Sequence, residues 1–284
     1  MEEHSRRKDS YVIDPTSGAE MARLIDQDNL VTRHMNGLFP EEVDLSTIRR
    51  VLDLACGPGG WVQEVAFHHQ NIEVTGVDIS REMIDYARAL TSVQGLDNAH
   101  FDVMDIRKPF DFDDDSFDFV NARFLVGVFS PGDWPGFLAE CKRILRPGGI
   151  MRLTETDDLG ISNSQALERL TELAVAAGRK TGRAFFPYGR FSGTMSMTGT
   201  LLRRAGFQDI HQQAHVMDWS VGTTSNRAQY DNIRILFMVG RPFVLGTGVV
   251  KEEEYDALYN HAMIEMLGED FCATMIYLSA WGRK

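Results

Sequence analysis

Short apolar runs alternate with longer segments of helical spacing through the middle of the chain. The runs are rich in β-branched and aromatic residues, and they cover residues 51–55, 72–78, 99–104, 117–123 and 150–155. Runs of this length and composition are typical of strands buried on both faces of a sheet. The segments at 61–66, 80–91 and 134–145 repeat apolar residues at intervals of three or four, which predicts helices. This alternation predicts an α/β fold with a parallel sheet.

Further elements flank this core. Residues 18–38 predict a helix ahead of the first strand, and residues 157–205 hold two helical stripes. A sixth strand is expected at 207–219 and a seventh at 271–281, with two helices between them. We expect one domain in three parts, namely an N-terminal arm and helical cap at 1–45, a core at 46–156, and the remainder of the same sheet with helical insertions at 157–284.

A glycine-rich turn separates the first strand from its helix. The segment reads Asp53-Leu54-Ala55-Cys56-Gly57-Pro58-Gly59-Gly60. Glycine leaves no Cβ between the main chain and a ligand, and the free N–H groups of the next helix would face the turn. Such a turn can hold a phosphate or a carboxylate. Asp53 ends a buried strand and needs a partner, and an ammonium group on a ligand would serve.

A second acid follows at an informative distance. Asp78 ends the next strand, about 20 residues after the turn, where an acidic side chain can take both ribose hydroxyls of a nucleoside. The alternative is that Asp78 caps the helix starting near Arg81. We expect Ser80 to take that role, because serine is a preferred N-cap residue.

These two segments resemble the first and second motifs of class I S-adenosylmethionine-dependent methyltransferases. Leu145-Arg146-Pro147-Gly148-Gly149 before an apolar strand is similar to a further motif of that family, and the resemblance is continuous over 51–155. It implies a Rossmann-like, seven-stranded, doubly wound sheet with the last strand antiparallel between strands five and six. The third glycine of G-x-G-x-x-G is missing, since position 62 is Val, which argues against a nicotinamide dinucleotide.

The resemblance implies S-adenosylmethionine as cofactor and S-adenosylhomocysteine as product. The cofactor-binding residues expected are Asp53, Ala55, Cys56, Gly57, Gly59, Asp78, Ile79, Met83, Asp105, Ile106 and Asn121. In the family, the acid at the position of Asp105 takes the exocyclic amine of adenine, and the next residue packs on the ring. The alternative for Asp105 is a loop aspartate beside Arg107, and the plainer interpretation of Cys56 is a small apolar filler.

Substrate contacts are less well defined. Arg123 could hold the cofactor's carboxylate, an acidic substrate, or a neighbouring acid. Tyr11 is a candidate on the N-terminal arm. Phe186 and Tyr188 belong to an aromatic, basic loop at 183–191, which either lines a pocket for a flat apolar substrate or packs an inserted helix on the sheet.

Catalytic candidates are few. His34 is the first candidate for a general base, because histidine titrates near neutrality; the alternative is a solvated or packing histidine. Glu155 and Asp157, at the exit of the fifth strand, could bind a substrate amine or a divalent metal. We expect no bound metal.

Composition narrows the class of partner. The net charge is −12, from 29 basic and 41 acidic residues, which disfavours a nucleic-acid substrate. No window is apolar enough to span a membrane, and the first residues lack the apolar core of a signal peptide. Three scattered cysteines without C-x-x-C spacing favour a reducing, cytoplasmic location.

The sequence therefore favours methyl transfer to a small molecule, with secondary metabolism as the setting. Oxygen is the favoured acceptor atom by resemblance, and nitrogen and carbon stay open. One alternative is a cofactor-binding protein that has lost transfer. Another is a cyclase or decarboxylase that uses the cofactor without net methyl transfer. The helical insertions could form a lid over the site or the surface of a homodimer.

Overall fold

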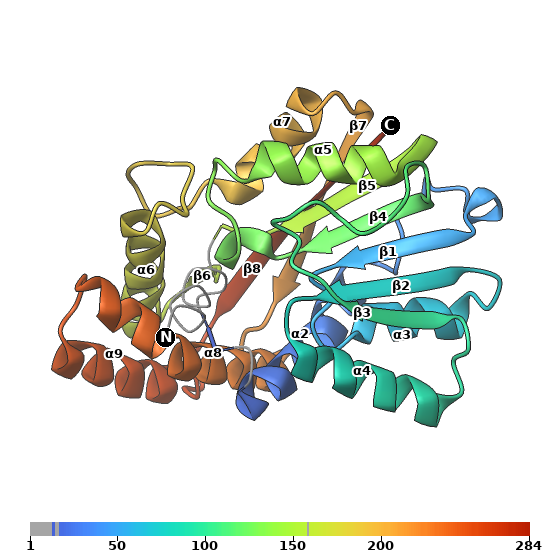
Figure 1. Cartoon of the computed structure of the whole chain (residues 1–284). Helices are drawn as coiled ribbons and strands as arrows, with labels where there is room; N and C mark the ends of the chain where they lie inside the picture. The colour runs from blue at the N-terminus through green and yellow to red at the C-terminus, as the bar shows by residue number, and fades with distance from the viewer. Residues whose placement is uncertain (1–12, 15–16, 158) are drawn as a thin grey trace, which may run out of the picture.

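An eight-stranded mixed sheet runs through the molecule (Figure 1). The computed structural model describes residues 13–14, 17–157 and 159–284. The strands are β1 (Arg50–Leu54), β2 (Glu73–Asp78), β3 (Ala99–Val103), β4 (Phe117–Arg123), β5 (Leu145–Glu155), β6 (Ile161–Ser162), β7 (Gln208–Asp218) and β8 (Ala273–Arg283). Their order is β3-β2-β1-β4-β5-β8-β6, with β7 also paired to β8.

The pairing directions confirm the expected Rossmann-like arrangement. Strands β1 to β5 are parallel, and β8 is antiparallel to both β5 and β7. The last strand thus lies between the predicted fifth and sixth strands. The expectation of seven strands was one short, because β6 also pairs with β8, at Ile161 and Ser162. Two residues are too few to carry an alternating pattern that the sequence could reveal.

The α-helices lie on the two faces of the sheet and beyond one end of it (Figure 1). They are α2 (Gly18–His34), α3 (Gly60–His68), α4 (Arg81–Gln94), α5 (Trp134–Ile144), α6 (Gln165–Lys180), α7 (Thr194–Arg204), α8 (Asn226–Thr247) and α9 (Glu252–Glu265). Two short 3₁₀ turns are η2 (Leu45–Thr47) and η3 (Leu125–Gly127). Helix α8 extends well beyond the predicted stripe and passes through Pro242, a residue that usually ends a helix.

The hydrophobic core has three parts that follow this layout. Helices α5 and α7 pack on one face of the sheet, and α3 and α4 pack on the other. The third cluster joins α2, α6, α8 and α9 to the ends of β7 and β8. In Figure 1, α6, α8 and α9 gather past the end of the sheet, so these helices and the strand ends face each other. Within the described ranges, no helix combines the length and apolarity needed to cross a membrane.

Candidate active site

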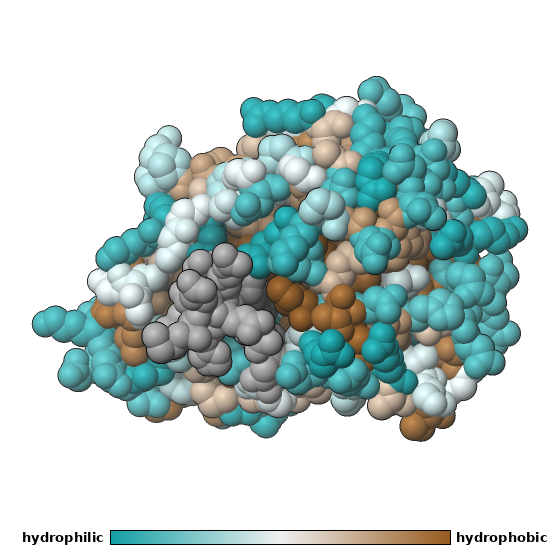
Figure 2. Space-filling model, viewed as in Figure 1, coloured by the Kyte–Doolittle hydropathy of each residue, from teal (hydrophilic) through white to brown (hydrophobic). Residues whose placement is uncertain are grey.

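A cavity of about 390 Å³ lies where the parallel strands end, and it continues between the helices beyond the sheet. Figure 2 shows hydrophobic residues gathered at the middle of the face where β1 and β2 end, framed by hydrophilic ones. The predicted residues that line the cavity are Asp53, Ala55, Cys56, Gly57, Asp78, Ile79, Met83, Asp105, Ile106 and Arg123. They form the part of the cavity that we call the cradle.

The glycine turn takes the backbone shape that its residues permit. Gly57 has φ +55° and Gly59 has φ +81°, both in the left-handed region that favours glycine. Gly59 is the N-cap of α3 and offers no side-chain hydrogen bond to the first N–H groups of that helix. Those groups are suited to a ligand oxygen. A Cβ on Gly59 would overlap Phe101, so Gly59 packs against β3 and does not line the cavity.

Asp78 is fixed by the backbone on both sides. Its Oδ2 accepts from the Gly57 amide at 2.9 Å, and its Oδ1 accepts from the Ser80 amide at 2.8 Å. Burial raises the pKa of this carboxyl. Ser80 caps α4 by accepting from the Met83 amide, as predicted, so Asp78 does not cap that helix. The Ile79 amide is a third donor to this carboxyl, and a carboxylate has acceptor capacity left for a hydroxyl in the cavity beyond three such bonds.

Asp53 belongs to a polar ladder that crosses three strands. The register aligns Asp53 with Asn121 and Asn121 with Arg152. Asn121 Nδ2 donates to Asp53 Oδ1 at 2.7 Å, and Arg152 Nε donates to Asn121 Oδ1 at 2.8 Å. Burial raises the pKa of Asp53 to about 7 and lowers that of Arg152 to about 9. Asn121 is fully buried and supports Asp53 without lining the cavity.

Helix α2 lies across the cradle through an ion pair. Arg123 binds Asp28 with Nη2 and donates to Thr32 Oγ1 with Nη1 at 3.1 Å. This is the salt bridge that the sequence left open for Arg123. Asp28 Oδ2 lies where a Cβ on Gly60 would stand, and it has no hydrogen-bond partner among the described residues. A buried carboxylate oxygen without a donor is costly, and a cationic ligand group would relieve that cost.

Asp105 has features of both alternatives that the sequence left open, a ligand contact and a loop aspartate beside Arg107. Both of its oxygens accept from Arg107 side-chain nitrogens at 3.0 Å. Burial alone would raise its pKa, but the hydrogen bonds from Arg107 outweigh burial and lower it. The same residue lines the cavity next to Ile106. An ion pair with Arg107 is therefore compatible with a ligand contact.

Two residues at the strand ends hold unusual backbone angles. Ala55 follows β1 with φ +56°, and Phe124 follows β4 with φ +57°. Both line the cavity. Residues other than glycine seldom adopt this region, and such positions are frequent at functional sites. The two bends turn the chain away from the sheet where the cavity begins.

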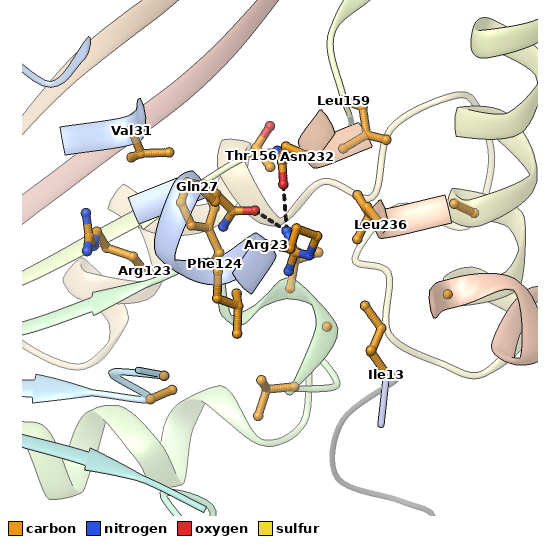
Figure 3. Close-up of a pocket in the computed structure, with 18 of the residues that line it drawn as sticks. Ile13, Arg23, Gln27, Val31, Arg123, Phe124, Thr156, Leu159, Asn232 and Leu236 are labelled. Atoms are coloured by element: carbon orange, nitrogen blue, oxygen red, sulfur yellow. Dashed lines mark hydrogen bonds between the residues drawn. The ribbon is translucent and has the colours of Figure 1, made fainter. Parts of the chain in front are cut away.

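The cavity continues past the cradle into a second part, which we call the arm. Figure 3 shows Phe124, Thr156, Leu159 and Leu236 around it, with Arg23 and Gln27 of α2 at its centre. Further lining residues come from α6, α8 and β8, and they include Ala174, Val175, Phe237, Phe243, Val244 and Tyr277. Sequence reasoning missed these residues, whose only signal was the apolar pattern of their helix or strand.

Part of the chain is similar in sequence to known methyltransferases. Residues 51–149 match the methyltransferase domain family. This match covers less than half of the chain, and it agrees with the resemblance of the sequence motifs to class I S-adenosylmethionine-dependent methyltransferases. The demethylmenaquinone methyltransferase of Staphylococcus aureus is 33% identical to it over 109 residues, which cover 38% of this chain and 43% of that protein. The match thus spans less than half of the relative's length.

Solved structures share the fold of this chain. The YcgJ protein of Bacillus subtilis aligns over 91% of this chain and 99% of its own, with TM-score 0.53 and 15% identity. Phosphoethanolamine N-methyltransferase 2 of Haemonchus contortus, solved with phosphomonomethylethanolamine and S-adenosylhomocysteine, aligns over 91% of this chain and 53% of its own, with TM-score 0.51 and 18% identity. At these identities the likeness concerns the fold.

The structure does not bring His34 to this cavity. Its Nδ1 lies 2.8 Å from the Leu30 carbonyl, and its Nε2 lies 3.1 Å from Ser225 Oγ. His34 is not among the lining residues. The geometry fits a packing histidine that joins α2 to the start of α8, and a role as base stays a prediction.

The aromatic loop contributes to the cavity through residues other than the predicted ones. Arg183, Ala184 and Ser192 line it, whereas Phe186 and Tyr188 do not. Tyr188 is 80% exposed, and Phe186 packs over Gly193, where the loop closes on itself. Tyr11 lies outside the described residues.

Of the two acids at the end of the fifth strand, Asp157 lines the cavity and Glu155 does not. Glu155 is fully buried, accepts from the Leu125 amide at 2.7 Å and does not line the cavity; burial raises its pKa to about 8. Asp157 lines the cavity and accepts from Ser192 Oγ at 3.0 Å and from the Met195 amide at 2.8 Å. Both acids hold loops in place. In the described part of the chain, no group of three or more His, Cys, Asp or Glu side chains could hold a metal ion.

Proposed function

We propose that this protein binds S-adenosylmethionine and transfers its methyl group to a small molecule. One observation carries the proposal: Asp53, Asp78 and Asp105 follow or end three neighbouring parallel strands and line a single cavity. Ligands of open parallel sheets bind beyond the carboxyl ends of the strands. By resemblance to the family, oxygen is the acceptor atom that we favour and secondary metabolism the setting, with nitrogen and carbon as the other acceptors to test.

The residues present suit this cofactor. Its ammonium and sulfonium groups are cationic, the cradle is lined by carboxylates, and Asp28 of α2 beside it has a buried oxygen without a donor among the described residues. Asp78 would accept from the ribose hydroxyls, and Asp105 would accept from the adenine amine beside Ile106. Asp53 would receive the ammonium group. Arg123 and the first N–H groups of α3 would receive the carboxylate.

When bound, the cofactor supplies a methyl group that its sulfonium makes electrophilic. The protein's own task is then alignment and the exclusion of water, and such positioning can contribute about 7–11 kcal/mol. Helix α2 closes the cradle through the pair of Asp28 and Arg123. No histidine is found among the described lining residues. The proposal therefore assigns positioning, rather than proton removal by a histidine, as the main contribution of the chain.

Calorimetric titration with S-adenosylmethionine and S-adenosylhomocysteine tests the proposal. Replacing Asp78 with Ala should weaken binding of both by about 1–3 kcal/mol, because the ribose hydroxyls lose a charged acceptor and Gly57 loses its anchor. The matched control is Asp102→Ala, an exposed acid on β3 that does not line the cavity.

Three outcomes are informative. Failure of the wild-type protein to bind either molecule would overturn the proposal. Equal affinity of wild type and Asp78→Ala would overturn the role of Asp78. Binding followed by a product without an added methyl group would favour a cyclase or a decarboxylase, and binding with no turnover of any substrate would favour a binding protein.

A further inference from the structure

The surface of the arm that faces the cavity is mostly apolar, although several of the residues that line it are polar. Tyr255 donates its hydroxyl to the Phe237 carbonyl at 2.7 Å, and Tyr277 donates its hydroxyl to Met217 Sδ at 3.3 Å. The Gln229 amide likewise lies 3.4 Å from Met275 Sδ. These polar groups are already paired with the protein. What remains on the cavity side of the tyrosines is the apolar part of each ring.

Two helical glycines widen the arm. Gly178 lies in α6 and Gly240 in α8, and both line the cavity. Among the described residues, apart from the adjoining residues and backbone of the same helix, no atom lies within 4 Å of the place where a Cβ on either glycine would stand. Glycine is a poorer helix former than alanine, so close packing of the protein gives no reason for it here. The space between α6 and α8 is suited to a ligand that enters between them.

One polar strip crosses this carbon surface. Arg23 is almost fully buried and pairs with Glu20 through two nitrogens, each at 2.7 Å. It also donates to Asn232 Oδ1 at 2.9 Å and to Gln27 Oε1, the two contacts drawn in Figure 3. Because Glu20 balances the charge of Arg23, the strip offers hydrogen bonds and little net charge. Gln27 lines the cavity with its oxygen fixed by Arg23, which orients its amide nitrogen.

We propose that the methyl acceptor is an uncharged, flat ring system, aromatic or polycyclic, that lies in the arm between α6 and α8. Its ring packs against Phe124, Phe237 and Phe243, and one oxygen or nitrogen of it meets the strip at Gln27. This inference rests on the proposed function and specifies its substrate class. A phosphorylated amine suits the arm less well, because most of its surface is apolar and the guanidinium of Arg183, which also lines it, lies over the Phe243 ring.

The test uses the bicyclic phenol β-naphthol as probe and phosphoethanolamine as the charged comparison. Binding of each to the full-length protein is measured with and without saturating S-adenosylhomocysteine. The wild-type protein should bind β-naphthol at least about tenfold more tightly than phosphoethanolamine, since only the former matches a carbon surface.

A matched pair of variants locates the binding. Gly240→Phe places a ring inside the arm, whereas Gly246→Phe puts the same ring on the same helix, at an exposed position outside the cavity. The first should weaken β-naphthol binding by at least about tenfold and the second by no more than about twofold. Gly178→Phe repeats the first test from α6. S-adenosylhomocysteine affinity reports whether each variant is folded.

The outcomes separate this inference from the proposed function. If S-adenosylhomocysteine binds but β-naphthol does not, or if Gly240→Phe and Gly178→Phe both leave β-naphthol affinity unchanged, the acceptor class is wrong and the cofactor assignment stands. Phosphoethanolamine binding as tight as that of β-naphthol would also overturn it. If S-adenosylhomocysteine does not bind, the proposed function fails, while loss of β-naphthol affinity in Gly240→Phe but not in Gly246→Phe would still support a ring-binding arm.

Discussion

The two parts of the cavity are made of different surfaces. The cradle is lined by carboxylates that follow successive strands, and it is backed by the buried ladder from Asp53 to Arg152. The arm is lined by aromatic and aliphatic side chains of helices, and its tyrosine hydroxyls are paired with the protein. The cradle therefore suits a charged ligand held by hydrogen bonds, and the arm suits a neutral one held by burial of apolar surface.

This difference affects how each part responds to change. Hydrogen-bonded charges in a buried ladder depend on each other, so one substitution leaves its neighbours without partners. A carbon surface loses only the contacts of the altered side chain, and surface ion pairs around it contribute little. The following predictions compare the two parts, from the largest expected effect to the smallest.

Replacing Arg152 with Ala should lower the free energy of unfolding by about 3–5 kcal/mol. Arg152 lies beneath Trp61 and Phe119, and it donates to Asn121 and to the Leu38 carbonyl. The substitution leaves a cavity and removes the donor to Asn121 Oδ1, while the Leu38 carbonyl keeps only its bond from Trp61 Nε1. Chemical denaturation measures the effect.

The matched control on the helical side is Arg241→Ala. Arg241 joins α8 to Asp256 and Glu252 of α9 and is about a third exposed, so its loss should cost about 1 kcal/mol or less. Similar losses for Arg152 and Arg241 would contradict the contrast between a buried ladder and surface pairs.

Protonation of Asp53 should couple cofactor binding to pH. Burial raises the pKa of Asp53 to about 7 in the folded protein. An ammonium group binds the ionised form, so binding of the cofactor near pH 6 should release a proton from Asp53. The contribution of Asp53 should make the affinity near pH 6 about tenfold weaker than near pH 8. Calorimetry in buffers of different ionisation enthalpy measures the protons released. Asp53→Asn should lose this component, and equal proton release in both proteins would contradict the assignment.

The same shift has the opposite effect on stability. Between 3.8, the ordinary pKa of an aspartate, and about 7, the folded protein keeps a proton on Asp53 that the unfolded chain has lost. The contribution of Asp53 to stability therefore falls as pH rises through this interval, and it levels off above it. Glu155, with a pKa of about 8, changes the stability in the same direction. Measurements of cofactor binding therefore report on Asp53 more specifically than measurements of unfolding do.

Replacing His34 with Gln should have the smallest effect. Both ring nitrogens face protein atoms, Leu30 O and Ser225 Oγ, so we expect a stability loss of about 1 kcal/mol or less. Turnover, once an acceptor is known, should stay within about twofold of wild type, whereas loss of a general base costs about a hundredfold or more. Ser225→Ala is the control that removes the same hydrogen bond from the other side. A large loss of turnover in His34→Gln but not in Ser225→Ala would support His34 as the general base.

Several site residues could be predicted because each lies at the end of a strand or within three residues of it. Asp53, Gly57, Asp78 and Asp105 are linked to their strands by a few bonds, so the strand pattern and the motif spacing placed them at one edge of the sheet. Asn121 was placed at the same edge, yet its side chain points into the ladder rather than the cavity. The alternation of a strand does not reveal which face meets a ligand.

Candidates outside the strands were much less predictable. Phe186 and Tyr188 were chosen for their aromatic rings, but the fold of their loop turns both away from the cavity and brings Arg183 and Ser192 to it instead. Asp28 and Gln27 gave no signal, because an acid and an amide on the polar side of a helix look like a solvated face. Their role comes only from where α2 lies.

The sequence by itself determined the order of the elements, the antiparallel last strand through its family resemblance, and most of the cradle, since these depend on local patterns and short spacings. Only the tertiary structure decided the arm. Arg23 and Asn232 are 209 positions apart, and Gly178 and Gly240 lie on different helices, so nothing near either residue in the chain encodes their shared cavity. Contacts between distant helices depend on how all the apolar faces pack together, and a single sequence does not display that packing.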